Sequence, residues 1–96
     1  VTAGEFDTFG DPDYAGAKIV MPPGEPVDTW ANEAEIARIR SLYAGEAAYV
    51  DYCVGHLFDA MREMGYFDDS VIVVQSDHGH PLGDHGKFLK GKSRLY

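Results

Sequence analysis

Hydrophobic residues recur at spacings of three and four positions from residue 32 to residue 64. This spacing lays one apolar stripe along a helix. Asn32 or Thr29 is suited to cap the start of the helix, and Gly65 suits a left-handed stop. The pattern therefore predicts one long helix with an apolar face. The stripe consists of Ile36, Ile39, Tyr43, Ala47, Val50, Val54, Leu57, Met61 and Met64.

Four residues in the predicted helix have a candidate role besides the apolar stripe. Gly45 and Gly55 each weaken a helix interior by about 1 kcal/mol relative to alanine, so we expect a break or a close packing contact near either one. Cys53 and His56 lie beside the stripe. For both, packing or surface placement is favoured over catalysis or metal ligation.

A short β-branched run, Val71–Val74, follows a connector after the helix. It shows no alternation of apolar and polar residues, which is typical of a strand buried on both faces of a parallel sheet. A helix, a tight connector and a buried strand form half of an α/β repeat. The pattern therefore predicts an α/β fold, with Ser76 to His78 at the strand end where ligands bind in such sheets.

Glycine and proline interrupt every periodicity near the start of the chain. We therefore expect an irregular, loop-rich segment over residues 1–31, with at most a short strand at residues 17–21, and a second unit over residues 32–96. The first segment is either a loop that lies over other structure or a disordered tail, and the sequence leaves both open.

The net charge of −8 argues against nucleic-acid binding, which needs a basic surface. No apolar run is long enough to cross a membrane, and a single cysteine forms no internal disulfide. The last ten residues reverse the charge locally, which indicates either an anionic ligand or a solvated basic loop. The bases there are Lys87, Lys90, Lys92 and Arg94.

Asp77 and His78 are the candidate metal ligands. Adjacent strand residues point to opposite faces, so the two side chains serve one ion only if the chain turns, which Gly79 permits. Two ligands do not complete a site, and a hydrogen-bonded turn is the alternative. A zinc cluster of His78, His80 and His85 is a weaker idea, because the spacing of known structural zinc sites is absent.

Several motifs in fixed order give the chain a family resemblance. They are "YVDYCVGHLFDAM", "MGYFDDSVIVV", "SDHG", "LGDHG" and a lysine thirteen positions after Asp77. Residues 42–96, which carry them, resemble the sulfatase family of the alkaline phosphatase-like superfamily. The resemblance implies a fragment of an α/β three-layer sandwich, with a mostly parallel sheet and helices on both faces.

The resemblance also implies the activity and the site. Sulfatases hydrolyse sulfate esters with a formylglycine nucleophile and one divalent cation, which we expect to be Ca²⁺ first and Mn²⁺ second. Asp77 and His78 fall on the family's metal-binding pair, and Lys90 falls on the lysine that contacts the sulfate group. Residues 84–86 match a recurrent "G-[DE]-H-G" segment that we interpret as structural support, and Asp51 matches a helix aspartate with the same interpretation.

Other family features have no match. Cys53 is not in the C/S-x-P-x-R motif that supplies the nucleophile, and the early paired aspartates and upstream histidine are missing. We therefore expect part of a catalytic domain, incomplete at both ends, inactive and poorly folded alone. The expected partners are the rest of that domain and a small-molecule or carbohydrate sulfate ester. The alternatives are a phosphonate monoester hydrolase or phosphodiesterase of the superfamily, or a catalytically silent metal-binding module.

Overall fold

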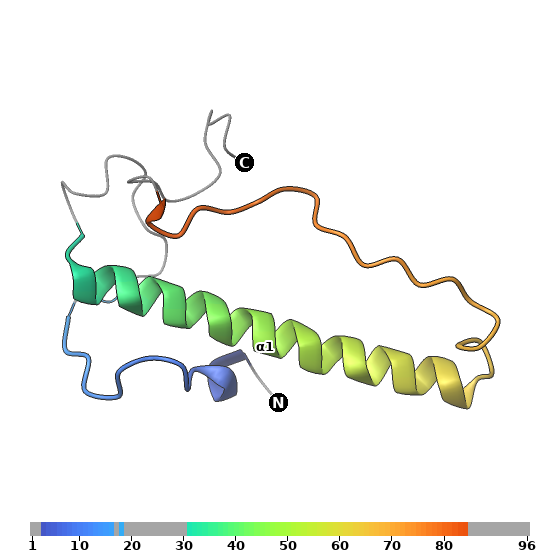
Figure 1. Cartoon of the computed structure of the whole chain (residues 1–96). Helices are drawn as coiled ribbons and strands as arrows, with labels where there is room; N and C mark the ends of the chain where they lie inside the picture. Colours follow the sequence, from blue (N-terminus) through green and yellow to red (C-terminus); the bar gives the residue numbers. More distant parts are fainter. Residues whose placement is uncertain (1–2, 17, 19–30, 85–96) are drawn as a thin grey trace.

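One long helix dominates the computed structural model, which describes residues 3–16, 18 and 31–84 (Figure 1). Helix α1 spans Glu33–Glu63, and a short 3₁₀ helix, η1, spans Ala3–Phe6. Residues 3–16 lie along one side of the helix, and residues 65–84 run back along another side towards the helix start (Figure 1). The helix predicted from the apolar stripe is confirmed.

The start of α1 is fixed by a capping box. The Asn32 side chain accepts a hydrogen bond from the Glu35 N–H at 2.9 Å, and the Glu35 carboxylate accepts one from the Asn32 N–H at 2.9 Å. Both bonds satisfy donors that an uncapped helix end would leave open. Of the two caps that the sequence offered, Asn32 is the one used; Thr29 lies outside the described residues.

The end of α1 follows the glycine stop that the sequence predicts. Gly65 has φ of 75°, a left-handed conformation that favours glycine. Its N–H donates to the Arg62 carbonyl at 3.1 Å, and the N–H of Tyr66 donates to the Met61 carbonyl at 2.8 Å. This pair of bonds is a Schellman motif, which satisfies two of the last carbonyls of the helix.

The described part of the N-terminal segment lies over α1. The Phe6 ring is 5.7 Å from the Tyr49 ring and 5.6 Å from the Tyr52 ring, measured between centroids. Arg38 donates two hydrogen bonds to the Asp7 carboxylate, at 2.8 and 2.6 Å. For residues 3–16 the overlying loop is therefore the correct alternative, whereas the short strand at 17–21 falls almost wholly outside the described residues.

The arginine and carboxylate of this contact change each other's ionisation. Their hydrogen bond lowers the pKa of Asp7 and raises the pKa of Arg38. Arg38 also lies over the Tyr14 ring at 5.9 Å. One helix side chain thus anchors two positions of the overlying segment.

The two helix glycines differ in their surroundings. A Cβ atom added to Gly45 would lie 2.9 Å from the carbonyl oxygen of Phe6, so only glycine lets the N-terminal segment approach the helix here. A Cβ atom on Gly55 would meet nothing within 4 Å. The expected close packing contact is therefore found at Gly45 and not at Gly55. Nearby, Ile39 and Ser41 are the other buried residues of α1.

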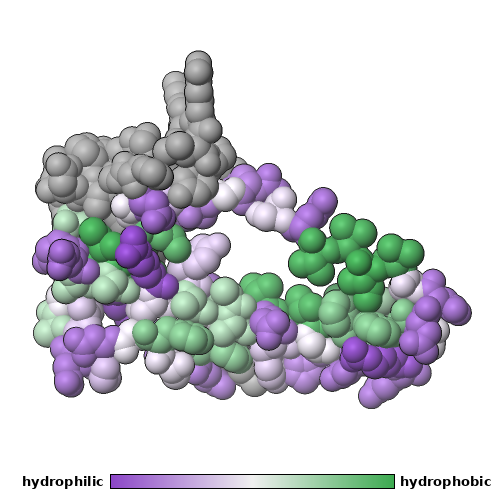
Figure 2. Space-filling view, in the orientation of Figure 1, coloured by the Kyte–Doolittle hydropathy of each residue, from purple (hydrophilic) through white to green (hydrophobic). Residues whose placement is uncertain are grey.

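The strand expected at Val71–Val74 is not present in the described structure, and the prediction that it is buried on both faces is wrong there. The four side chains are between 40% and 93% exposed, and residues 3–16, 18 and 31–84 contain no strand. Figure 2 shows hydrophobic surface gathered at the end of the molecule where α1 ends. An isolated β-branched run has no ladder to join, because the backbone bonds of a strand are made with a neighbouring strand.

Candidate functional site

The predicted metal ligands lie where the extended segment bends. The chain turns at Asp77 and His78, and the hydroxyl of Ser76 donates to the carbonyl of His78 at 2.5 Å. The Asp77 side chain is 88% exposed and the His78 side chain 36% exposed. The bend brings the two side chains together: Asp77 Oδ2 lies 3.6 Å from His78 Nε2.

The histidine ring is held in place by a backbone hydrogen bond. His78 Nδ1 lies 2.7 Å from the carbonyl oxygen of Gly79, which only accepts hydrogen bonds, so Nδ1 carries the proton and donates. The other ring nitrogen, Nε2, faces the Asp77 carboxylate. A backbone hydrogen bond to the far nitrogen is the usual way in which proteins orient a histidine ligand.

The two facing atoms fit the first half of a divalent-cation site. Oxygen and nitrogen atoms that bind one cation at about 2.4 Å and at right angles lie about 3.4 Å apart, close to the 3.6 Å between Asp77 and His78. Within the described residues no third histidine, cysteine, aspartate or glutamate joins them. The donors fit a cation, and further ligands are required from outside the part of the chain that the structure describes.

A second turn follows the pair at once and returns the chain to α1. Gly83, with φ of 88°, is its left-handed residue. The Asp84 carboxylate accepts from the N–H of Leu82 at 3.0 Å, while Arg40 Nε of α1 donates to the Leu82 carbonyl at 2.9 Å. The prediction that Asp84 gives structural support to this loop agrees with these bonds.

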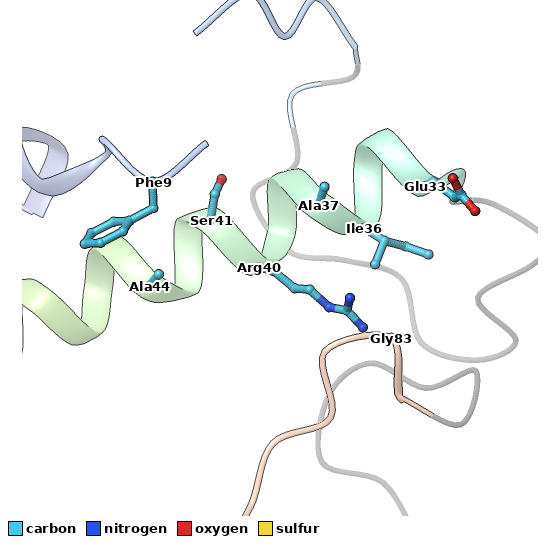
Figure 3. A pocket seen from close by; sticks show the side chains of 8 residues that line it. All are labelled: Phe9, Glu33, Ile36, Ala37, Arg40, Ser41, Ala44 and Gly83. Carbon is cyan, nitrogen blue, oxygen red and sulfur yellow. The ribbon is translucent and has the colours of Figure 1, made fainter. Parts of the chain in front are cut away.

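Between this turn and the N-terminal segment lies an open hollow of about 590 Å³. Figure 3 shows Arg40 reaching from the helix towards the turn at Gly83, with Phe9 on the far side. The side chains that line the hollow are mostly small or apolar, and Glu33 and Arg40 are the charged ones among them. The lining residues are Phe9, Glu33, Ile36, Ala37, Arg40, Ser41, Ala44 and Gly83.

The other candidate residues from the sequence analysis either lie away from this site or lie outside the described residues. Lys90 and His85 lie outside the described residues. Cys53 and His56 are exposed on α1, as the favoured interpretation predicts. Cys53 raises the pKa of the Tyr49 phenol, mainly through Coulombic repulsion and also through a hydrogen bond.

Sequence reasoning missed Arg40. Its bond to the Leu82 carbonyl joins residues 42 positions apart, and no local pattern marks a helix arginine for that contact. The available signal was its place beside the apolar stripe, between Ile39 and Tyr43, where a charged side chain borders the face that other segments cover.

Comparisons with known proteins give a consistent result. The sequence model of the family described as Sulfatase matches residues 2–96, which extends the likeness well before residue 42. A sulfatase of Formosa agariphila is 36% identical over 90% of this chain and 17% of its own length. An arylsulfatase of Clostridium perfringens is 32% identical over 62% of this chain and 12% of its own length.

A further relative is the multifunctional alkaline phosphatase superfamily protein PehA of Trinickia caryophylli, 43% identical over 56% of this chain and 10% of its own length. The chain thus spans 17% or less of the length of these three curated relatives. No solved structure matches. No helix in the described residues is long and apolar enough to cross a membrane. The match over residues 2–96 shows that the chain belongs to the sulfatase family.

Proposed function

We propose that the protein containing this chain is a sulfuric ester hydrolase, and that Asp77 and His78 supply two ligands of its divalent cation. The observation that carries the proposal is the pair itself: an exposed carboxylate lies 3.6 Å from Nε2 of a histidine whose other nitrogen is hydrogen-bonded to the backbone. Relatives named as sulfatases support hydrolysis of sulfate esters at the level of the family.

The family implies an alkaline phosphatase-like α/β fold. We place this chain in the catalytic domain of a three-layer sandwich with a mostly parallel sheet, in which Val71–Val74 is a strand and α1 covers one face. The exposed β-branched run and the exposed part of the helix stripe support this arrangement, because both need a neighbouring sheet to cover them. Residues 1–96 alone then lack most of the site and are inactive.

The residues of this chain have separate tasks in the proposed reaction. Asp77 and His78 hold the cation, which when bound neutralises charge on the ester oxygens. The ammonium of Lys90 contacts the sulfate group and offsets the charge that grows as the bond to the leaving oxygen breaks. The nucleophile is a formylglycine from a C/S-x-P-x-R motif outside these residues, because Cys53 does not match that motif.

The identity of the cation rests on two opposed arguments. A histidine ligand is more natural for manganese or zinc than for calcium, which prefers oxygen. The sulfatase resemblance favours calcium. We therefore propose Ca²⁺ first and Mn²⁺ second, with a small-molecule or carbohydrate sulfate ester as substrate.

Substitution of the pair in the full-length protein tests the proposal. Asp77→Asn and His78→Ala should each remove most of the bound cation, measured by elemental analysis, and lower turnover of an aryl sulfate at least a hundredfold. Asp59→Asn is the matched control, because this exposed carboxylate pairs with Arg62, three residues away on the same helix. Wild-type protein without a stoichiometric divalent metal would contradict the proposal.

Lys90 is tested against its two neighbours. Lys90→Ala should lower kcat on the order of a hundredfold and leave the bound cation in place, because removal of one charge-stabilising contact has that order of effect. Lys87→Ala and Lys92→Ala are the controls and should change kcat much less. Equal, mild effects of all three would mean a solvated basic loop.

The second candidate is a phosphonate monoester hydrolase or phosphodiesterase of the same superfamily. It is favoured by the likeness to the multifunctional superfamily protein of Trinickia caryophylli. The ratio of turnover on an aryl sulfate to turnover on an aryl phosphonate monoester decides between the two enzymes. A full-length sequence without a C/S-x-P-x-R motif would instead indicate the catalytically silent metal-binding module.

A further inference from the structure

We propose that Arg40 of α1 is a positioning residue for the Asp77–His78 pair. It fixes on the helix the turn into which the chain runs directly after the pair. The inference rests on the proposed function, since it concerns the cation site of that enzyme. Arg40 itself contacts neither ligand in the described structure, and its effect passes through Leu82 and Asp84.

The turn is held by both polar groups of one peptide residue. The carbonyl of Leu82 accepts from Arg40 Nε at 2.9 Å, and its N–H donates to the Asp84 carboxylate at 3.0 Å. The other oxygen of Asp84 lies 3.7 Å from a terminal nitrogen of Arg40. The guanidinium therefore meets the turn at two points, which its planar fork permits and a lysine ammonium does not.

A ring contact supports the same attachment. Tyr43, three residues after Arg40, lies on the same face of α1. Its ring stacks on the ring of His80, with centroids 6.1 Å apart and planes inclined by 27°. Pro81, between His80 and Leu82, is fully buried. The segment from His80 to Asp84 is thus attached to the helix by two side chains one turn apart.

This attachment matters because the chain before it is loosely supported. Residues 68–79 are exposed throughout, whereas Pro81 is buried and Leu82 is half-buried. The return to α1 begins at His80, two positions after His78. The position of the pair relative to the helix therefore depends on the turn that Arg40 holds on its C-terminal side and, in the proposed full-length fold, on the Val71–Val74 strand on its other side.

The test measures cation binding rather than turnover alone. Mn²⁺ is titrated into the metal-free full-length enzyme by calorimetry. Arg40→Ala should raise the Mn²⁺ dissociation constant about tenfold, since loss of an outer-shell contact typically weakens metal binding by ten- to a hundredfold. Arg40→Lys keeps the charge without the two-point contact and should give an intermediate value. Turnover lost by Arg40→Ala should return in excess Mn²⁺, which a general loss of fold would not allow.

Arg62→Ala is the matched control. Arg62 is also an exposed arginine of α1 paired with an aspartate, but it contacts Asp59 and the Phe67 ring at the far end of the helix. Arg62→Ala should therefore leave the Mn²⁺ dissociation constant unchanged. Amide exchange at Leu82 provides a readout without metal, and Arg40→Ala should accelerate it while Arg62→Ala should not.

The outcomes separate the two proposals. If Asp77→Asn loses Mn²⁺ and Arg40→Ala binds it like the wild type, the positioning role is wrong and the cation site stands. If the wild type binds no divalent cation, the proposed function fails, and this inference fails with it. If Arg40→Ala does not fold, Asp84→Asn replaces it: that variant keeps an acceptor for the Leu82 N–H and loses the charge, and unchanged Mn²⁺ binding would overturn the inference.

Discussion

The two halves of α1 carry the same apolar spacing but have different surroundings. The first half holds the buried residues of the helix, Ile39, Ser41 and Gly45, under the N-terminal segment and beside the returning turn. The second half contains no buried residue, and Val50 and Leu57 on its stripe are 58% and 56% exposed. The comparison teaches that a stripe states which face of a helix is apolar, while burial depends on which segments return to cover that face.

The largest effect is expected from removing a stripe side chain in each half. Ile39→Ala should lower the free energy of unfolding by about 2 kcal/mol or more, because Ile39 is 7% exposed and its loss leaves a cavity. Leu57→Ala should cost less than about 0.5 kcal/mol in the same chain. Circular dichroism of residues 1–96 during denaturant titration measures both. Because residues 1–96 are expected to fold poorly alone, the Ile39→Ala loss should also appear as a lower helix content before denaturant is added.

The two substitutions Ile39→Ala and Leu57→Ala sharpen the comparison when they are made in the full-length protein. If a sheet covers the second half of α1 there, Leu57→Ala should become about as costly as Ile39→Ala. A Leu57→Ala cost that stays small in the full-length protein would show that this face remains uncovered.

The two helix glycines should respond with opposite signs. Gly45→Ala should destabilise residues 1–96 by about 1 kcal/mol or more, because the new methyl group would press on the Phe6 backbone. Gly55→Ala should stabilise them by about 1 kcal/mol, because alanine favours the helix and the space is open. Stabilisation by both substitutions would show that the N-terminal segment is not held against Gly45.

A smaller effect is expected at the start of the helix. Asn32→Ala removes the capping side chain and should lower the free energy of unfolding by about 1 kcal/mol. Asn32→Asp keeps an acceptor for the Glu35 N–H and serves as the control. Amide exchange should show the loss in the first turn of α1 only, and an equal increase along the whole helix would contradict a local role.

The smallest effect is the pH dependence of the Asp7 contact. The hydrogen bond from Arg38 lowers the pKa of Asp7 below its ordinary value of 3.8. A depressed pKa means that the stabilisation is fully present above that ordinary value and is lost as the pH falls through the folded-state pKa. Asp7→Asn should remove this acid-dependent part from the melting temperature, and the effect should be small because the pair is exposed to solvent.

The candidate site divides in the same way into local and non-local parts. That Asp77 and His78 lie together was predictable, because they are neighbours and a bend at Asp77 and His78 brings them to one side. The hydrogen bond between His78 Nδ1 and the Gly79 carbonyl was not predictable from the sequence, because it depends on the backbone conformation of the bend. The predicted strand failed for a related reason: β-branched residues favour a strand, but only a partner strand completes its hydrogen bonds.

The sequence by itself determined α1 and both of its ends, since the stripe, the Asn32 and Glu35 cap and the Gly65 stop act between residues a few positions apart. Family motifs in the sequence also marked Asp77, His78 and Lys90 as candidate site residues, which remain predictions. Only the tertiary structure decided that Gly45 and not Gly55 receives another segment, and that Arg40 holds the turn at Leu82. Such contacts join positions some forty residues apart, and they form only where the folded chain brings a complementary backbone group within hydrogen-bonding or van der Waals distance.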